Sequence, residues 1–384
     1  MDLRWTPEQE AIRSKVRQFA QTEVASAIPQ MERDDEHAFP AHLVARMAEL
    51  GLMGIPIAAE WGGAGADFIS YIIAIHELAK ASAAVGVILS VHTSVGTLPI
   101  LKHGTDEQRH NYVNRLASGK WLGAFALTEP QAGSDAASIR MTATREEDGY
   151  RLNGAKLFIT NGGAADVYLT FAVTDASRGT RGISAFLVGR DTPGFQVGRR
   201  ERKMGLHGSS TCELLFDDVR LSADERLGGE GEGFAIAMGA LDGGRIGIGA
   251  QALGIAESAL QLLAAAVRRS RSGTASQQRT IAPPAARAAL AELTARGEAA
   301  RLLVYRAAAL RQQGRSCTKE ASMAKLFASD TAVEVTTAAV RWCGERGFAK
   351  PYAAERLFRD AKVTQIYEGT NEIHRIVIGN QLLR

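Results

Sequence analysis

The longest helical pattern in the chain is GEGFAIAMGALDGGRIGIGAQALGIAESALQLLAAAVRR, residues 231–269. Two more long helices and two shorter helical pieces are expected downstream, at about 285–313, 318–342, 352–361 and 370–382. Leu326, Val333 and Val340 recur every seven residues, which is typical of one buried stripe in a helical bundle. The pattern therefore predicts a C-terminal helical bundle domain over residues 226–384.

The sequence that precedes the bundle has the pattern of strands. In VYLTFAV, Val167, Leu169, Phe171 and Val173 alternate and should share one face of a strand. Asn153 and Gly154 stand between two apolar runs, which predicts a β-hairpin. Residues 121–225 are therefore expected to form a central β domain, either a barrel or a sandwich.

The first part of the chain is again helical. Thr6, Pro7 and Gln9 form the pattern of a capping box with proline at the first helical position, and Thr105 and Gln108 repeat the cap. Residues 1–120 should form an N-terminal α-helical domain. Helices, then strands, then helices predict a multidomain α+β protein without alternating βαβ units.

Composition excludes several functional classes. The chain has 384 residues, a net charge of +3 and no run of eighteen apolar residues, so neither nucleic-acid binding nor an integral membrane segment is expected. Three scattered cysteines, Cys212, Cys317 and Cys343, predict neither a disulfide framework nor a metal site. A reducing, cytoplasmic location is the expectation.

Two strings in the β domain have the composition of a ligand site. In ALTEPQAGSDAAS, residues 126–138, small residues and the hydroxyls of Thr128 and Ser134 could surround an anion, although the chemistry alone slightly favours a polar loop with a helical turn. Phe158 and Thr160 should lie on the same side of a strand, where a ring and a hydroxyl suit a flat heterocycle. The alternative is an ordinary core phenylalanine beside a surface threonine.

A single carboxylate stands out in TQIYEGTNEIHR, residues 364–375. Most glutamates are solvated surface charges, but the nearest preceding neighbours of Glu368 carry no charge. A carboxylate in apolar surroundings has a raised pKa and is a stronger base. The glycine strings GGEGEGF and GGRIGIG do not follow a strand in a βαβ unit, so a dinucleotide fingerprint is rejected.

Taken in order, LTEPQAGSD, NGAKLFITNG, KMGLHGSSTCELLFDDV, LDGGRIGIGAQALGIAESAL and QIYEGTNEIHR resemble the acyl-CoA dehydrogenase family over essentially the whole chain. The resemblance implies an N-terminal helical domain, a central β domain and a C-terminal four-helix bundle. It implies FAD-dependent dehydrogenation of an acyl-CoA to a trans-2-enoyl-CoA, with electrons passed to an electron-transfer flavoprotein. A homotetramer is implied, with a dimer as the alternative.

By the same resemblance Glu368 is the catalytic base that removes the α-proton. Some members of the family carry the base just before the arginine of the first bundle helix, where this chain has Gly244. Since Gly244 offers no carboxylate, Glu368 is the remaining candidate. Gly369 would let the chain pass close to the thioester.

The resemblance also maps the binding residues. Those expected at FAD are Phe125, Leu127, Thr128, Gly133, Ser134, Phe158, Ile159, Thr160, Arg269, Arg341, Thr370, Asn371 and Glu372. Those expected at the acyl-CoA substrate are Ser134, Asp242, Arg245 and Gly369.

Two strings depart from the family pattern. Where relatives carry Arg-x-x-Phe-Gly, Arg269 and Gly273 match but Ser272 replaces the phenylalanine. Where relatives often carry Gln-x-x-Gly-Gly, Arg341 and Glu345 replace the glutamine and the last glycine. By the resemblance both strings belong to the intersubunit part of the FAD site, so the departures concern that part rather than the catalytic part.

The acyl chain is expected to be short, of butyryl size. VGVILSVHTSVGTLPILKHGT resembles the corresponding region of short-chain members, and Val91 and Leu98 are bulky enough to help close a pocket. Branched short chains, an acyl group carried on a protein, and a non-catalytic paralogue are the alternatives.

Overall fold

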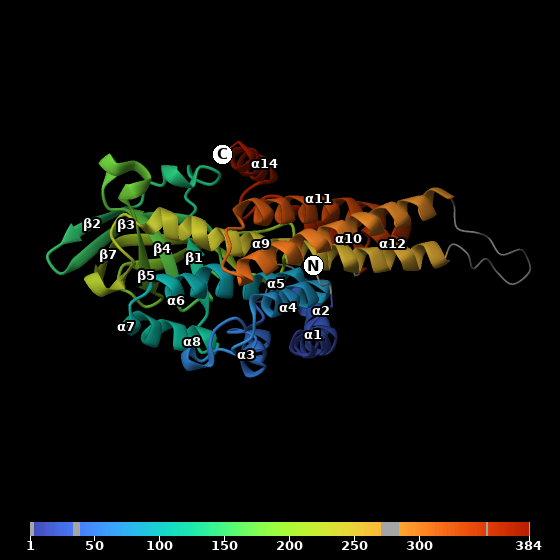
Figure 1. Ribbon diagram of the computed structural model, residues 1–384, viewed down its shortest axis with the longest axis horizontal. Coiled ribbons are helices and arrows are strands. Elements are labelled where there is room, and N and C mark those ends of the chain that lie inside the picture. Colours follow the sequence, from blue (N-terminus) through green and yellow to red (C-terminus); the bar gives the residue numbers. More distant parts are fainter. Residues whose placement is uncertain (1–3, 34–38, 270–283, 351, 384) are drawn as a thin grey trace, which may run out of the picture.

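The computed structural model describes residues 4–33, 39–269, 284–350 and 352–383. A β domain lies at one end of the molecule, and the long helices of the C-terminal part extend away from it (Figure 1). The N-terminal helices lie along one side of these long helices. This arrangement confirms the predicted fold class, with helical, β and helical parts in that order.

The N-terminal part is helical, as expected. Its α-helices are α1 Pro7–Phe19, α2 Ala25–Met31, α3 Ala41–Glu49, α4 Phe68–Ala81, α5 Ala83–Ser90, α6 Leu98–His103, α7 Asp106–Gln108 and α8 Asn114–Ala117. Both predicted capping boxes are present, since Thr6 and Thr105 each accept from the backbone N–H three residues on. A π-helical turn, η3 (Val91–Thr97), joins α5 to α6 and packs against both the first strand and the bundle.

The β domain forms one eight-stranded sheet in the order β6-β7-β3-β2-β4-β5-β8, with β1 paired to β4. Its strands are β1 Gly123–Ala126, β2 Thr142–Glu146, β3 Gly149–Thr160, β4 Val167–Val173, β5 Ile183–Gly189, β6 Phe195–Arg200, β7 Thr211–Ser222 and β8 Arg226–Leu227. The β1–β4 pair is parallel, whereas β3, β7 and β6 pair antiparallel. β1 therefore places the chain that follows it beside the centre of the sheet.

The hairpin predicted at Asn153–Gly154 is wrong. The two residues lie inside β3, where a register shift against β7 marks a bulge and Gly154 has a φ of 147°. A Cβ at Gly154 would lie 2.9 Å from Met141, so this site requires a glycine for close approach rather than for a turn. The hairpin instead pairs β2 with β3, where Glu146 faces Gly149.

The alternation predicted for β4 is confirmed, and both of its faces are buried. Val167, Leu169 and Phe171 belong to one hydrophobic cluster, and Tyr168 and Ala172 belong to another. A strand that is covered on both sides holds its register firmly, because a one-residue slip would exchange the two clusters.

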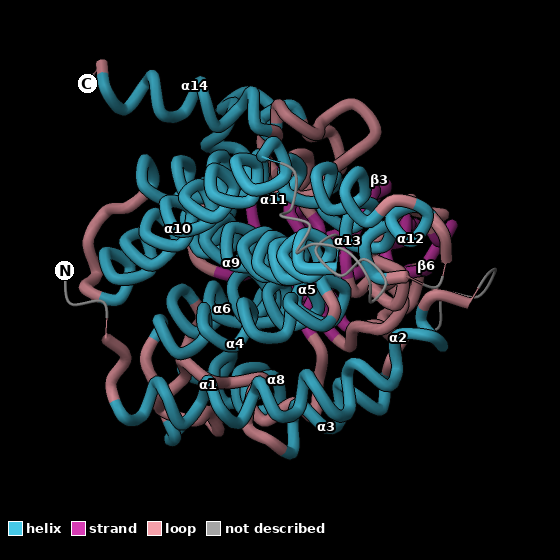
Figure 2. Tube along the Cα trace, turned by 90° about the vertical axis from the view of Figure 1, so that its right-hand side faces the viewer, coloured by secondary structure: helices cyan, strands magenta, loops and turns pink. Residues whose placement is uncertain are grey.

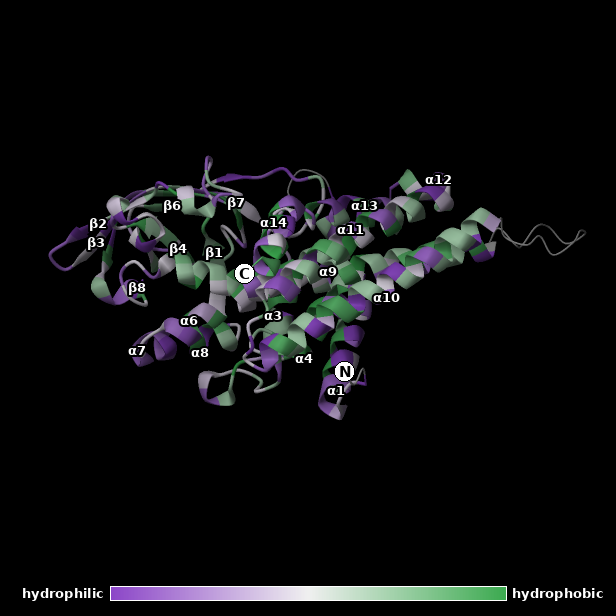
Figure 3. Ribbon diagram, turned by 45° about the horizontal axis from the view of Figure 1, so that its top comes forward, coloured by the Kyte–Doolittle hydropathy of each residue, from purple (hydrophilic) through white to green (hydrophobic). Residues whose placement is uncertain are grey.

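The C-terminal helices agree closely with the predicted ranges. They are α9 Gly233–Arg269, α10 Pro284–Gln312, α11 Thr318–Cys343, α12 Glu345–Phe348, α13 Ala353–Val363 and α14 Asn371–Leu382. α9 packs against α10, α11, α13 and the N-terminal α4, so it lies at the centre of the molecule. Figure 3 shows this centre as the more hydrophobic part, with α1, α7 and the β2–β3 turn hydrophilic.

The stripe predicted on α11 is only half-buried. Leu326, Val333 and Val340 lie at the edge of the packed face. The buried face consists mostly of small residues, namely Ala321, Ser322, Ala324, Lys325, Ala328, Ser329, Thr331, Ala332, Val335, Thr336 and Ala339. Small side chains let α9 and α11 approach closely, and one of the buried residues is a lysine.

Two helical stretches, Ala83–His103 and Gly233–Arg268, are long and apolar enough to cross a bilayer. In the folded chain 89% and 61% of their apolar windows are buried inside the protein. Both are therefore core helices of this fold.

Candidate active site

The turn between α13 and α14 holds Glu368 in an unusual backbone conformation. Glu368 has a φ of 56° and Gly369 a φ of 92°, so two consecutive residues are left-handed. The turn is closed by the N–H of Asn371, which donates to the carbonyl of Gln365 at 3.0 Å, and Thr370 caps α14. A non-glycine residue in this region is held there by its surroundings at a cost, which is common at functional sites.

The turn aims the carboxylate of Glu368 at Gly244 on α9. A Cβ added to Gly244 would lie 2.8 Å from both Cδ and Oε1 of Glu368. The residue keeps some exposure, but its Oε2 is buried and has no hydrogen-bond partner. The structure thus brings the two alternative family positions for a base to the same point in space.

Burial decides the proton affinity of Glu368. It raises the pKa of the carboxyl to about 7, against the opposing positive charges of Arg245 and Lys325. Such a group exchanges its proton near neutral pH, which is what a general base requires.

Arg245 lies beside this carboxylate and is itself buried. Its Nη1 donates to Asp242 at 3.0 Å, and Asp242 also accepts from Thr318 at 2.6 Å. Its Nε is buried without a hydrogen-bond partner. The predicted substrate residues Asp242, Arg245 and Gly369 therefore gather around Glu368, and an unused donor remains among them.

Buried hydroxyl groups lie next to the turn. Tyr71 of α4 donates to the carbonyl of Ser90 at 2.9 Å, and Tyr367 donates to the side chain of Gln251 on α9. Burial raises the pKa of both tyrosines, and the charge of Glu368 adds to the effect. These phenols stay protonated, so Glu368 is the group of this cluster that can accept a proton near neutral pH.

The loop from Leu127 to Ser134 is held in place by a buried ion pair. Lys156 is 0% exposed and donates to Glu129 at 2.7 Å and to the carbonyl of Leu127 at 3.1 Å. Glu129 also accepts from the backbone of Arg140 at 2.6 Å. The loop is thus a built structure rather than a plain polar connection, and Gly133 and Ser134 are exposed on it.

Phe158 presents its ring to the outside of β3. It is 59% exposed, has a φ of 56° and lies within the irregularity between Lys156 and Ile159 in the pairing of β3 with β7. The N–H of the preceding Leu157 donates to the carbonyl of Thr128 at 2.8 Å, which joins the two predicted ligand strings. Ile159 is buried and Thr160 half-buried, so the exposed ring and the two threonines, Thr128 and Thr160, are the groups free to meet a flat ligand.

Some predicted cofactor residues have other surroundings. The side chain of Asn371 is buried and bonds to Lys325 at 3.0 Å and Asp330 at 2.7 Å, while Glu372 is exposed. Phe125 and Leu127 face the core. Thr370 uses its hydroxyl as the cap of α14. Apart from the exposed Glu372, these residues shape the site rather than offer free side chains to it.

Arg269 and Arg341 lie apart from all of these residues. Arg269 is the last residue of α9 and Arg341 lies in the last turn of α11, and both helices run away from the β domain toward these ends (Figure 1). Arg341 is exposed, with its guanidinium 5.6 Å from the ring centre of Trp342. The side chain of Arg269, and Ser272 and Gly273, lie outside the described residues.

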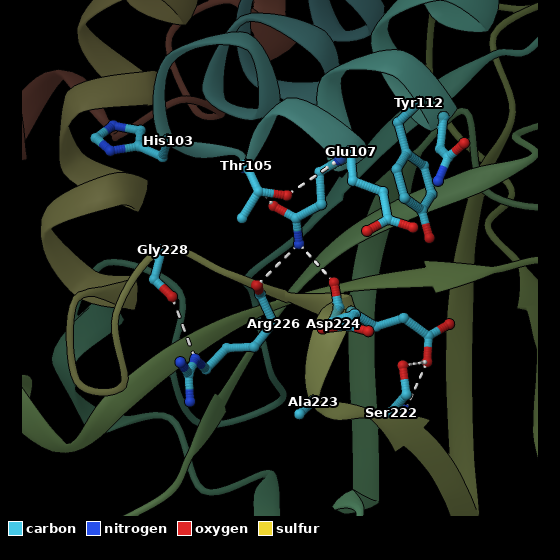
Figure 4. Close-up of a pocket in the computed structure, with 12 residues that line it drawn as sticks. His103, Thr105, Glu107, Tyr112, Ser222, Ala223, Asp224, Arg226 and Gly228 are labelled. Carbon is cyan, nitrogen blue, oxygen red and sulfur yellow. Dashed lines mark hydrogen bonds between the residues drawn. The ribbon is translucent and has the colours of Figure 1, made fainter.

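A separate cavity of about 610 Å³ lies between α7 and the end of β7. Figure 4 shows Thr105, Asp224 and Arg226 among its lining residues. Gln108 crosses it and donates to the carbonyls of Asp224 at 2.7 Å and Arg226 at 2.9 Å. Its polar groups serve the contact between helix and sheet, and Glu368 is not among its lining residues.

Sequence reasoning missed Lys156, Lys325, Tyr71 and Gln251. Lys156 carried one usable signal, since it falls on the buried side of an alternating strand. The other three come from separate helices and reach Glu368 or its neighbour Tyr367 only through the tertiary fold. In the described part of the chain no group of histidine, cysteine and carboxylate side chains could hold a metal ion.

Comparison with known proteins places three family models on this chain. They are the N-terminal, middle and C-terminal domains of acyl-CoA dehydrogenase, over residues 6–120, 124–219 and 231–383. An acyl-CoA dehydrogenase of Bacillus subtilis is 56% identical over 98% of both chains.

Two solved structures are similar over their full length. The butyryl-CoA dehydrogenase of Megasphaera elsdenii has a TM-score of 0.95 and 44% identity, with 100% of both chains covered. A chain in a structure of the electron transferring flavoprotein of Acidaminococcus fermentans has a TM-score of 0.95 and 45% identity, also with 100% of both chains covered.

Proposed function

Because the chain belongs to the acyl-CoA dehydrogenase family, we propose that it dehydrogenates short-chain acyl-CoA thioesters with Glu368 as the catalytic base. The observation that carries the proposal is the buried carboxylate of Glu368, held in a left-handed turn with an unpartnered Oε2 and a pKa near neutrality.

The protein is an FAD-dependent oxidoreductase, as this family is. The residues that fit the cofactor are the exposed ring of Phe158, whose strained backbone suits a stacking surface, and the hydroxyls of Thr128 and Thr160. The exposed Gly133 and Ser134 would allow a close backbone approach, since a Cβ at Gly133 would meet nothing within 4 Å. The chemistry that bound FAD would supply is an acceptor for the β-hydrogen of the substrate as hydride.

Glu368 would break the Cα–H bond of the thioester and take the proton on its carboxylate. The bond's electron pair remains on the substrate and forms the new double bond as the β-hydrogen leaves. Oε2 suits this role because it is buried and holds no competing hydrogen bond. Tyr71 and Tyr367 lie close enough for the charge of Glu368 to raise their pKa further, and both stay protonated.

The α-proton is weakly acidic, so the thioester carbonyl must be polarised. In the described chain no backbone carbonyl accepts a hydrogen bond from the N–H of Glu368. We assign this N–H to the thioester oxygen. The adjacent Gly369 keeps the turn free of a side chain, and a Cβ there would lie 3.2 Å from the ring of His374.

A short acyl chain agrees with the packing below the base. Tyr71 is fully buried and bonds to Ser90, and the half-buried Tyr367 bonds to Gln251, so polar groups next to the base limit the space for an apolar tail. The butyryl-CoA dehydrogenase among the similar structures supports the same size. Comparing rates with butyryl-, isobutyryl-, hexanoyl- and octanoyl-CoA would test it; a maximum at octanoyl-CoA would contradict it.

We assign the electrons to an electron-transfer flavoprotein, and the similar chain found in such a structure supports this partner. Reoxidation of the reduced enzyme by an electron-transfer flavoprotein should be much faster than by oxygen. The position of Arg269 and Arg341 near the ends of α9 and α11, away from the β domain, suits a contact with another subunit, as in a homotetramer. Light scattering of the purified protein would distinguish tetramer, dimer and monomer.

The decisive experiment is the visible spectrum before and after anaerobic addition of butyryl-CoA. The flavin band should bleach in the native enzyme and persist in Glu368→Gln, while Glu298→Gln, an exposed carboxylate on α10, should behave as the native enzyme does. Bleaching at the native rate in Glu368→Gln would overturn the assigned base. Bleaching only with a butyryl group on a carrier protein would move the substrate to protein-bound thioesters.

A further inference from the structure

Lys325 is a buried cation that the reaction described above does not use. It is 0% exposed on the small-residue face of α11. Its Nζ donates to the carbonyl of Gly369 at 2.7 Å and to Oδ1 of Asn371 at 3.0 Å. Lysine is almost never fully buried without a partner, and both partners here are neutral groups of the turn that carries Glu368.

The two bonds hold the turn on both sides of Thr370. Gly369 directly follows Glu368, and Asn371 is the first residue of α14, which lies over α11 in Figures 1 and 2. On the other side of Gly369 the ring of His374 fills the space that a Cβ would need. The peptide next to the carboxylate is thus clamped between an ammonium and an imidazole.

The charged and titratable groups around Lys325 come from three helices and the turn itself. They are Glu368 of the turn, Arg245 of α9, Asp330 of α11, and Glu372 and His374 of α14. Burial lowers the pKa of Lys325 to about 7, and the negative charge of Glu368 acts to raise it. Burial and the charges of Lys325 and Arg245 keep His374 neutral, with a pKa of about 3. The ammonium and the carboxylate therefore stabilise each other's charged forms.

We propose that Lys325 is a positioning residue of the dehydrogenation, which fixes the Glu368–Gly369 turn through Gly369 and Asn371 and sets a cation behind the base. The proposal rests on the role assigned to Glu368. Without the ammonium the Gly369 carbonyl and the Asn371 side chain lose a donor, and Arg245 remains as the positive charge opposed to protonation of Glu368.

The test is the pH dependence of single-turnover flavin reduction by butyryl-CoA in four variants of the holoenzyme. Lys325→Met and Lys325→Gln remove the charge and should move the acidic limb by about one unit to higher pH, since a tenfold weaker ionisation equals one unit. Lys325→Arg keeps the charge and should leave the acidic limb at its native pH. Ser329→Ala is the matched control, because Ser329 bonds to the same Asn371 without a charge.

A second readout separates proton removal from oxidation. A thioester with sulfur in place of the β-carbon has no β-hydrogen to lose, so solvent deuterium enters its α-position only through the base. Lys325→Met should slow this exchange about tenfold below neutral pH, because a rise of one unit in the pKa of Glu368 leaves about a tenth as much of it ionised. The dissociation constant of this thioester from the Lys325→Met variant, measured by titration, should differ less than about threefold from its value for the native enzyme.

The proposal is overturned if the acidic limb of the pH–rate profile stays at its native pH in both Lys325→Met and Lys325→Gln, and the rate of flavin reduction falls only in proportion to the stability of each variant. If Lys325→Met does not fold, Lys325→Gln decides, because it keeps a donor and loses only the charge. A limb that moves equally in Ser329→Ala would reduce Lys325 to a packing residue. Failure of the base assignment is recognised separately, by unchanged flavin reduction in Glu368→Gln.

Discussion

The chain buries two lysines next to carboxylates, and the two pairs have opposite consequences. Lys156 donates directly to Glu129, whose oxygens also accept three further hydrogen bonds, and the pKa of Glu129 is lowered despite burial. Lys325 donates to the turn and leaves Oε2 of Glu368 unpartnered, so burial raises the pKa of Glu368 to about 7. Direct hydrogen bonding makes a carboxylate structural, and a cation held one peptide away leaves it reactive.

The largest effect should come from removing the reactive carboxylate. Glu368→Gln keeps the size of the side chain and removes the base, so flavin reduction by butyryl-CoA should fall by about 10³-fold or more. Glu129→Gln should instead lower the thermal denaturation midpoint, because Lys156 would lose its counter-charge. Stopped-flow absorbance and calorimetry on both variants distinguish the two carboxylates; a reversed pattern would refute the comparison.

The next largest effect should come from breaking the structural ion pair of Lys156 and Glu129. Lys156→Met leaves Glu129 buried without its ammonium, which should cost about 3–5 kcal/mol of unfolding free energy. Urea denaturation measures this cost. Lys120→Met, at an exposed lysine, is the control and should change stability by less than about 0.5 kcal/mol. A loss equally small in Lys156→Met would contradict the structural role of the pair.

The two carboxylates should also titrate in different ranges. Glu368 acts as its anion, so the rate of flavin reduction should rise with pH and level off above about 7. Glu129 has a pKa below its ordinary 4.5, so its contribution to stability is complete above that value and is lost as the pH falls further. A rate that is flat from acid to neutral pH would show that Glu368 is not the titrating base.

A smaller effect should follow from crowding the reactive carboxylate. Gly244→Ala puts a methyl group within 2.8 Å of Cδ of Glu368, so the carboxylate must move and flavin reduction should slow about tenfold with the flavin retained. Gly239→Ala lies on the same helix with nothing within 4 Å of its Cβ, so it should react as the native enzyme does. Equal rates in the two variants would place the carboxylate elsewhere.

Much of the fold could be predicted from local patterns. Both capping boxes and the long C-terminal helices agree with the structure because hydrogen bonds within a few residues determine them. Asn153–Gly154 was misread because the same pair serves a turn and a bulge, and only the contact with Met141 decides between them. The α11 stripe was misread because its core face consists of alanines rather than large apolar residues.

The residues of the site also divide into those that the local sequence identifies and those that only tertiary contacts bring there. Glu368 could be identified because a distinctive string surrounds it, and Lys156 carried the weaker signal of strand alternation. Lys325 stands in ASMAKLFAS, forty-three residues before Glu368, where nothing local separates it from a surface lysine. Its role depends on α14 crossing α11, which is a tertiary contact.

The left-handed turn at Glu368 also bears on how this protein can change. Its backbone disfavours any side chain, and its carboxylate is ionised in a buried place, so the fold is less stable for having it. Glu368→Gly should therefore melt at a higher temperature than the native protein above neutral pH, and be inactive. Selection for stability alone would replace Glu368, so its retention in a lineage would indicate that the lineage still uses it in catalysis.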